Sequence, residues 1–90
     1  MIKIRIPPVL RDATGGKREV EADGSSVREL LEDLTGRFPQ LEERILQDGE
    51  LAQFVNLYLD GEDVRTRDGL ETPVREDATL ILLPAMAGGF

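Results

Sequence analysis

Two segments of the chain alternate apolar and polar residues with a period of two. In residues 2–6 isoleucine alternates with a basic residue, and Pro7 follows directly. Residues 53–59 alternate in the same way, with Phe54 and Tyr58 on the face opposite the aliphatic residues. Successive side chains of a strand point to opposite sides, so this pattern predicts two strands, each with one buried face.

Three further strands are predicted around turn signals. Residues 17–21 form a short, mostly polar run behind the turn-forming residues 12–16, which predicts a hairpin with a long, loose tip. Asp60-Gly61 is a strong signal for a tight turn into a short return strand at 62–65. Residues 79–83 form the last strand, and the proline that follows closes it.

Helical spacing appears once, after residue 25. Ser26 is a good N-cap, and Glu29 stands three residues later, as a capping box requires. Gly36 is the predicted stop, and Pro39 forbids continuation. Residues 41–46 are expected to add a short helical turn. The apolar stripe of the helix consists of Val27, Leu30, Leu31 and Leu34.

The order of these elements predicts a fold of the α+β class. The apolar stripe of the helix needs a partner, so the helix must cover one face of the sheet. We expect the first and last strands to lie side by side at its centre. A mixed sheet packed on one main helix is the β-grasp fold. Ninety residues make one domain, with residues 1–84 as its body and 85–90 as a flexible C-terminal tail.

Composition narrows the chemistry that the chain itself can do. It contains no cysteine and no histidine, which removes thiolate catalysis, cysteine-ligated metals and the commonest general base. Adjacent carboxylates such as Glu42-Glu43 and Glu76-Asp77 are bounded by turns, which is typical of a solvated surface. We therefore assign no catalytic residue, no metal site and no bound cofactor, and we expect a protein that is not an enzyme.

The charge and the apolar runs bear on location and partners. The net charge is −7, and the eleven basic residues are spread from Lys3 to Arg75, so nucleic acid is not an expected partner. An acidic protein can dock on a basic patch of another protein, or its charge can serve solubility alone. Residues 80–87 are far too short an apolar run to span a membrane, and no signal peptide is evident, so we expect a cytoplasmic protein.

The C-terminal residues are small and lack polar side chains. Pro84 has no amide hydrogen with which to extend a sheet, and Gly88-Gly89 carries no Cβ near its carboxyl end. Such a segment can be threaded into a narrow slot of another protein. The alternative is a frayed terminus with two chance glycines.

The second half of the chain resembles a known family. The resemblance rests on residues 54–65 (Phe-Val-Asn-Leu-Tyr-Leu-Asp-Gly-Glu-Asp-Val-Arg), 69–74 (Gly-Leu-Glu-Thr-Pro-Val) and 77–89 (Asp-Ala-Thr-Leu-Ile-Leu-Leu-Pro-Ala-Met-Ala-Gly-Gly). These segments are similar to the ubiquitin-like sulfur carriers of the MoaD/ThiS family, and most similar to the CysO-type carriers of cysteine biosynthesis. Residues 7–11 and 14–16 resemble the first hairpin of that subgroup.

The resemblance implies a carrier that partner enzymes act upon. An E1-like enzyme of the MoeB/ThiF type would use ATP to adenylate the terminal carboxylate, and a sulfur donor would convert it into a thiocarboxylate. Gly89 would carry the sulfur and Gly88 would keep the neck slim. The sulfur would pass to an acceptor enzyme, here a PLP-dependent cysteine synthase, although the molybdopterin, thiazole and thiolated-tRNA pathways stay open.

Phe90 departs from the family pattern, in which the mature chain ends at the second glycine. While Phe90 is attached, the carboxyl group of Gly89 is an unreactive amide. We therefore expect a precursor that a partner metalloprotease trims. Two alternatives remain: a protein modifier joined to lysines of target proteins, and a non-covalent β-grasp adaptor that never loses Phe90.

Partner docking is expected on the outer face of the sheet. If Leu80 and its alternate neighbours point to the helix, Ile81 and Leu83 must point away from it. With Phe54 and Tyr58 they would form an apolar patch beside the tail. The alternative is a central strand buried on both sides.

Overall fold

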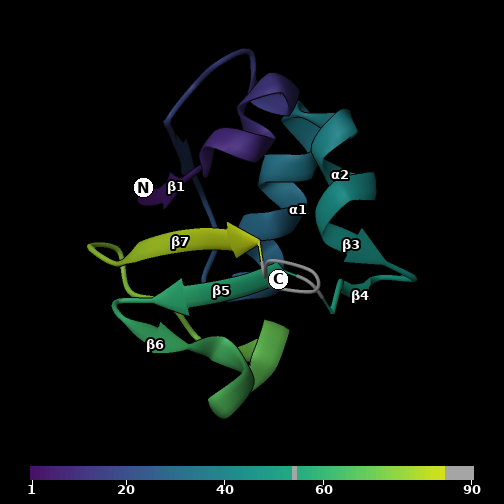
Figure 1. Ribbon diagram of the computed structural model, residues 1–90. Helices are drawn as coiled ribbons and strands as arrows, with labels where there is room; N and C mark the ends of the chain where they lie inside the picture. The colour runs from purple at the N-terminus through teal and green to yellow at the C-terminus, as the bar shows by residue number, and fades with distance from the viewer. Residues whose placement is uncertain (54, 85–90) are drawn as a thin grey trace.

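Five strands form one mixed sheet, and the main helix lies across one of its faces (Figure 1). The computed structural model describes residues 1–53 and 55–84. The strands of the sheet, in the order β2-β1-β7-β5-β6, are β1 (Ile2–Arg5), β2 (Glu19–Ala22), β5 (Val55–Leu59), β6 (Glu62–Asp63) and β7 (Thr79–Pro84). The helices are α1 (Val27–Arg37) and α2 (Pro39–Ile45), with the 3-10 helices η1 (Pro8–Thr14), η2 (Val64–Thr66) and η3 (Gly69–Glu71).

The first and last strands lie side by side, as predicted. β1 runs parallel to β7 with Ile4 opposite Leu80, while β2 and β5 pair antiparallel with β1 and β7 respectively. β7 is therefore the middle strand of the sheet. This arrangement of a mixed sheet around one main helix confirms the β-grasp fold.

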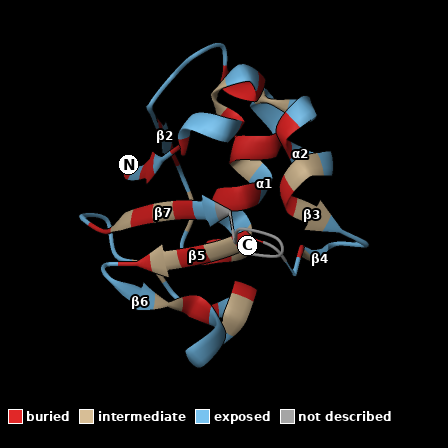
Figure 2. Cartoon of the chain, viewed as in Figure 1, coloured by how far each residue is buried: buried red, intermediate tan, exposed pale blue. Residues whose placement is uncertain are grey.

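The core lies between α1 and the inner face of the sheet. The apolar stripe of α1 is at most 1% exposed, and alternate residues of β1, β5 and β7 face the same core (Figure 2). Leu57, Leu80 and Leu82 are fully buried there. Burial of each such leucine contributes about 2 kcal/mol to the free energy of folding, so this face is the main source of stability in so small a domain.

The start of α1 confirms Ser26 as the N-cap and corrects the capping box. The hydroxyl of Ser26 accepts a hydrogen bond from the amide of Glu29 at 3.2 Å. The Glu29 carboxylate reaches past Ser26 and accepts from the amide of Ser25 at 2.8 Å and from its hydroxyl at 3.0 Å. These hydrogen bonds lower the pKa of Glu29 below its ordinary value, and the bond from the Ser25 amide has the largest effect.

Gly36 does not end the helix, which corrects the prediction. It lies inside α1, which runs on to Arg37, and the amide of Phe38 still bonds to the carbonyl of Leu34 at 2.9 Å. The stop comes from Pro39, whose ring disfavours a helical residue before it and which then begins α2 as its first residue.

Three other local predictions were wrong in detail. The loose hairpin tip is mostly the ordered helix η1, and β2 begins at Glu19 rather than residue 17. The return strand is only β6, after which the chain turns into η2. A small hairpin, β3 (Leu46–Gln47) with β4 (Glu50–Leu51), follows α2 and was not predicted.

Candidate functional site

Three predicted docking residues come together on the outer face of β5 and β7. Tyr58 lies opposite Ile81 in the antiparallel register, and Asn56 lies opposite Leu83. Tyr58 and Ile81 are half-buried, whereas Leu83, one residue before the end of β7, is 42% exposed. The alternative of a strand buried on both sides is therefore wrong.

Charged residues continue this face on either side. In the strand register Arg5 on β1 lies opposite Ile81, and Glu19 on β2 lies opposite Arg5. On the other side of the sheet Asp63 of β6 lies opposite Tyr58. The register partners that cross the sheet from β2 to β6 are therefore, in order, acidic, basic, apolar, aromatic and acidic residues. A surface with an apolar middle and a charged rim is typical of protein–protein recognition.

Arg65 is a residue of this face that the sequence reasoning missed. Its guanidinium donates to the side-chain oxygen of Asn56 and to the carbonyl of Ala52, each at 2.8 Å. These bonds hold the start of β5 from outside the sheet. The pattern gave no signal for them, because residues 62–65 were expected to continue as a strand, whereas η2 turns Arg65 back toward β5.

β7 ends at Pro84, the last residue that the structure describes. Pro84 pairs with Val55, the first residue of β5, so the described chain ends on the central strand beside the start of β5. The predicted sulfur-carrying residues Gly88 and Gly89, the processing residue Phe90 and the docking residue Phe54 lie outside the described residues. Their roles stay predictions.

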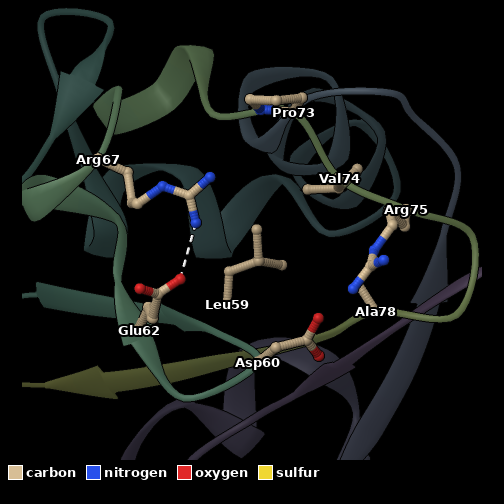
Figure 3. A pocket seen from close by; sticks show the side chains of 8 residues that line it. All are labelled: Leu59, Asp60, Glu62, Arg67, Pro73, Val74, Arg75 and Ala78. Atoms are coloured by element: carbon tan, nitrogen blue, oxygen red, sulfur yellow. Dashed lines mark hydrogen bonds and ion pairs between the residues drawn. The ribbon is translucent and has the colours of Figure 1, made fainter.

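The cavity drawn in Figure 3 lies at the other end of β7. Its volume is about 330 Å³, and it is lined by Leu59, Asp60, Glu62, Arg67, Pro73, Val74, Arg75 and Ala78. Arg67 and Glu62 form an ion pair at 2.7 Å across one side of it. The length of β7 separates this cavity from Pro84 at the other end of the strand.

Residues 1–53 and 55–84 bring no three His, Cys, Asp or Glu side chains together as a metal site. None of their helices has the length and apolar character that crossing a bilayer requires.

The fold and this outer face define a ubiquitin-like protein whose described residues end on the central strand. Residues 4–89 match the model of the ThiS family. The sulfur carrier protein CysO of Mycobacterium tuberculosis (strain ATCC 25618 / H37Rv) is 36% identical over 91 residues, with 98% of each chain covered. The chain therefore belongs to the ThiS family.

Solved structures agree with this assignment. The crystal structure of the Amycolatopsis orientalis BexX/CysO complex superposes with a TM-score of 0.93 at 40% identity, covering 99% of this chain and all of that one. The small archaeal modifier protein 1 of Methanosarcina acetivorans superposes with a TM-score of 0.87 at 28% identity, covering 98% and 95%. The similarity to CysO carriers supports a sulfur-carrier role.

Proposed function

We propose that this protein carries sulfur as a thiocarboxylate on Gly89, after removal of Phe90, and that the sulfur serves cysteine biosynthesis. The observation that carries the proposal is similarity to CysO carriers along nearly the whole chain, which extends through the Gly88-Gly89 end. The chain itself is a carrier, and its partner enzymes supply the catalysis.

Activation requires a better leaving group than a carboxylate oxygen. In the proposed step the Gly89 carboxylate attacks the α-phosphorus of ATP held by an E1-like enzyme of the MoeB/ThiF type, and pyrophosphate leaves. Hydrosulfide then attacks the carbonyl carbon of the acyl-adenylate, AMP leaves with the bonding electron pair, and the S–H proton is lost to solvent. The product is a thiocarboxylate whose sulfur is nucleophilic.

The domain would hold the reacting end at a defined distance from its docking face. Residues 85–89 can span at most about 17 Å when fully extended. An activating site deeper than this below the partner's surface would be out of reach. The exposed Leu83 immediately precedes this segment in the chain. Contact of a partner with Leu83 would therefore position residues 85–89 at the partner's binding slot.

Phe90 would have to be removed before activation. Its presence converts the reactive carboxylate of Gly89 into an amide, and amides do not displace pyrophosphate from ATP. A metalloprotease is the proposed partner for this trimming. A PLP-dependent cysteine synthase is the proposed sulfur acceptor, and the ATP requirement places the cycle in the cytoplasm.

Conjugation to target lysines is the second candidate. It is favoured by the structural similarity to the small archaeal modifier protein 1, which shares the fold over nearly the full chain. Both candidates need an adenylated Gly89. They differ in the product: a free thiocarboxylate in one case and an isopeptide-linked target in the other.

Mass spectrometry of residues 1–89 tests the proposal. Incubation with the activating enzyme of the same cell, ATP and a sulfide source should replace one oxygen by sulfur, and the full chain ending in Phe90 should stay unmodified. Loading of the full chain would contradict the precursor, and no loading of either chain would contradict the carrier. Isopeptide-linked products in cell extract, without thiocarboxylate, would favour the modifier.

A further inference from the structure

Three arginines gather around one cavity at the end of β1. Arg5, Arg11 and Arg18 line a space of about 350 Å³ together with Ile6 and Glu19. The sequence alone suggested scattered basic residues, but η1 folds back and brings Arg11 next to the ends of β1 and β2. We call the cavity lined by these three arginines the basic pocket.

The pocket lies in the one basic part of an acidic chain. Residues 1–18 contain five basic side chains and a single acidic one, whereas residues 19–90 contain six basic and seventeen acidic side chains. The field of the molecule is therefore strongly asymmetric. Anionic partners are attracted at this end and repelled elsewhere, which orients the encounter.

Asp12, the single acidic residue among residues 1–18, forms an ion pair with Arg44, which does not line the pocket. Both carboxylate oxygens of Asp12 accept from Arg44 on α2, at 2.8 and 2.9 Å, and Arg44 also donates to the carbonyl of Val9 at 2.7 Å. The hydrogen bond from Arg44 lowers the pKa of Asp12, so its charge persists but is matched by Arg44 rather than by the pocket.

The arginines of the pocket keep their charge available. Arg11 donates through Nε to the carbonyl of Ile6 at 3.1 Å, which fixes its guanidinium while leaving the two terminal nitrogens for another acceptor. Within residues 1–53 and 55–84, neither Arg5, Arg11 nor Arg18 forms an ion pair, although Glu19 stands on the rim.

The pocket lies beside the outer face, at the end of the sheet where β7 ends. Arg5 pairs with Ile81 across the β1–β7 ladder. Because β1 and β7 are parallel, the end of β1 that forms the pocket lies at the same end of the sheet as Pro84. A protein that grips the C-terminal segment would therefore reach the pocket in the same encounter.

We propose that the basic pocket binds an acidic segment, with at least two carboxylates, of the protein that receives the C-terminus. Paired carboxylates match the fork of arginine donors. Nucleic acid matches the pocket less well, because its extended phosphate charge would meet the acidic remainder of the chain. The inference rests on the proposed function for its partner, but not for the chemistry of the pocket.

Charge removal at matched positions tests the proposal with the activating enzyme. Arg5→Gln/Arg18→Gln removes two charges from the pocket, and Arg67→Gln/Arg75→Gln removes two charges at the opposite end of β7. In ATP–pyrophosphate exchange with residues 1–89, the pocket variant should raise KM about tenfold at low salt, and the control less than about twofold. Equal KM values for both variants, with equal thermal midpoints, would overturn the proposal.

A titration independent of activation tests the pocket itself. Hexaglutamate added to the full chain should shift the amide resonances of residues 5, 11 and 18, and Arg11→Gln should reduce these shifts. No shifts there, or tighter binding of single-stranded DNA than of hexaglutamate, would overturn the pocket as a carboxylate site. If residues 1–89 fail to support exchange while hexaglutamate binds, the proposed function fails and the pocket stands.

Discussion

Leu82 and Leu83 are adjacent on β7 and face opposite environments. Leu82 is fully buried against the core, whereas Leu83 is 42% exposed on the outer face. Both residues are leucine, so their chemistry cannot explain the difference, and only the side of the strand does. The comparison teaches that the two faces divide the work: the inner face supplies stability, and the outer face is free to serve recognition.

Truncation of the two leucines should separate these roles most strongly. Leu82→Ala should lower the free energy of unfolding by about 2–5 kcal/mol, because it opens a cavity in the core. Leu83→Ala should cost less than about 1 kcal/mol, because water already reaches that side chain. Denaturant titration of both variants measures the difference. Similar losses would mean that the outer face also supports the fold.

A charge at Leu83 should affect binding and spare the fold. Leu83→Glu should weaken binding to the activating enzyme at least about tenfold, since it places an unpaired charge in an apolar contact. Leu83→Met, which keeps the apolar contact, should bind nearly as the natural chain does. Calorimetric titration measures both. Unchanged binding of the glutamate variant, with an unchanged thermal midpoint, would remove Leu83 from the docking face.

The smallest effect concerns the helix that covers the inner face. The hydrogen bonds from Ser25, that from its amide above all, hold the pKa of Glu29 below its ordinary value, so the stabilising contribution of Glu29 is present above that ordinary value and is lost as the pH falls through the depressed pKa. The difference in thermal midpoint between the natural chain and Glu29→Gln should therefore be largest near neutral pH and vanish in acid. A difference that stays constant with pH would contradict this role of Glu29.

Much of the fold was readable from the sequence because its signals are local and repeated. Alternation placed β1 and β5, and the spacing of the apolar residues placed α1. The last strand was predicted at residues 79–83, one residue short of β7. Asp60-Gly61 adopts the left-handed turn that its residue types predict. The same residue types at Asp48-Gly49 form the turn between β3 and β4. This hairpin was not predicted, because strands of two residues are too short to show alternation.

The remaining features depend on contacts between distant residues. η1 is held by Arg44, which lies more than thirty positions away in sequence. Arg65 reaches Asn56 only because η2 turns the chain back, and the basic pocket exists only because η1 folds onto the ends of β1 and β2. Periodicity reports which face a residue occupies, but not which distant partner it meets.

The central place of β7 has a consequence for synthesis of the chain on the ribosome. The middle strand of the sheet is also the last to be translated, so β1 and β5 have no strand between them until residue 84 has left the exit tunnel. Helix α1 can form early, but the sheet cannot close until β7 has emerged. Nascent chains of this protein would therefore stay open to proteases and chaperones until residue 84 has emerged from the ribosome.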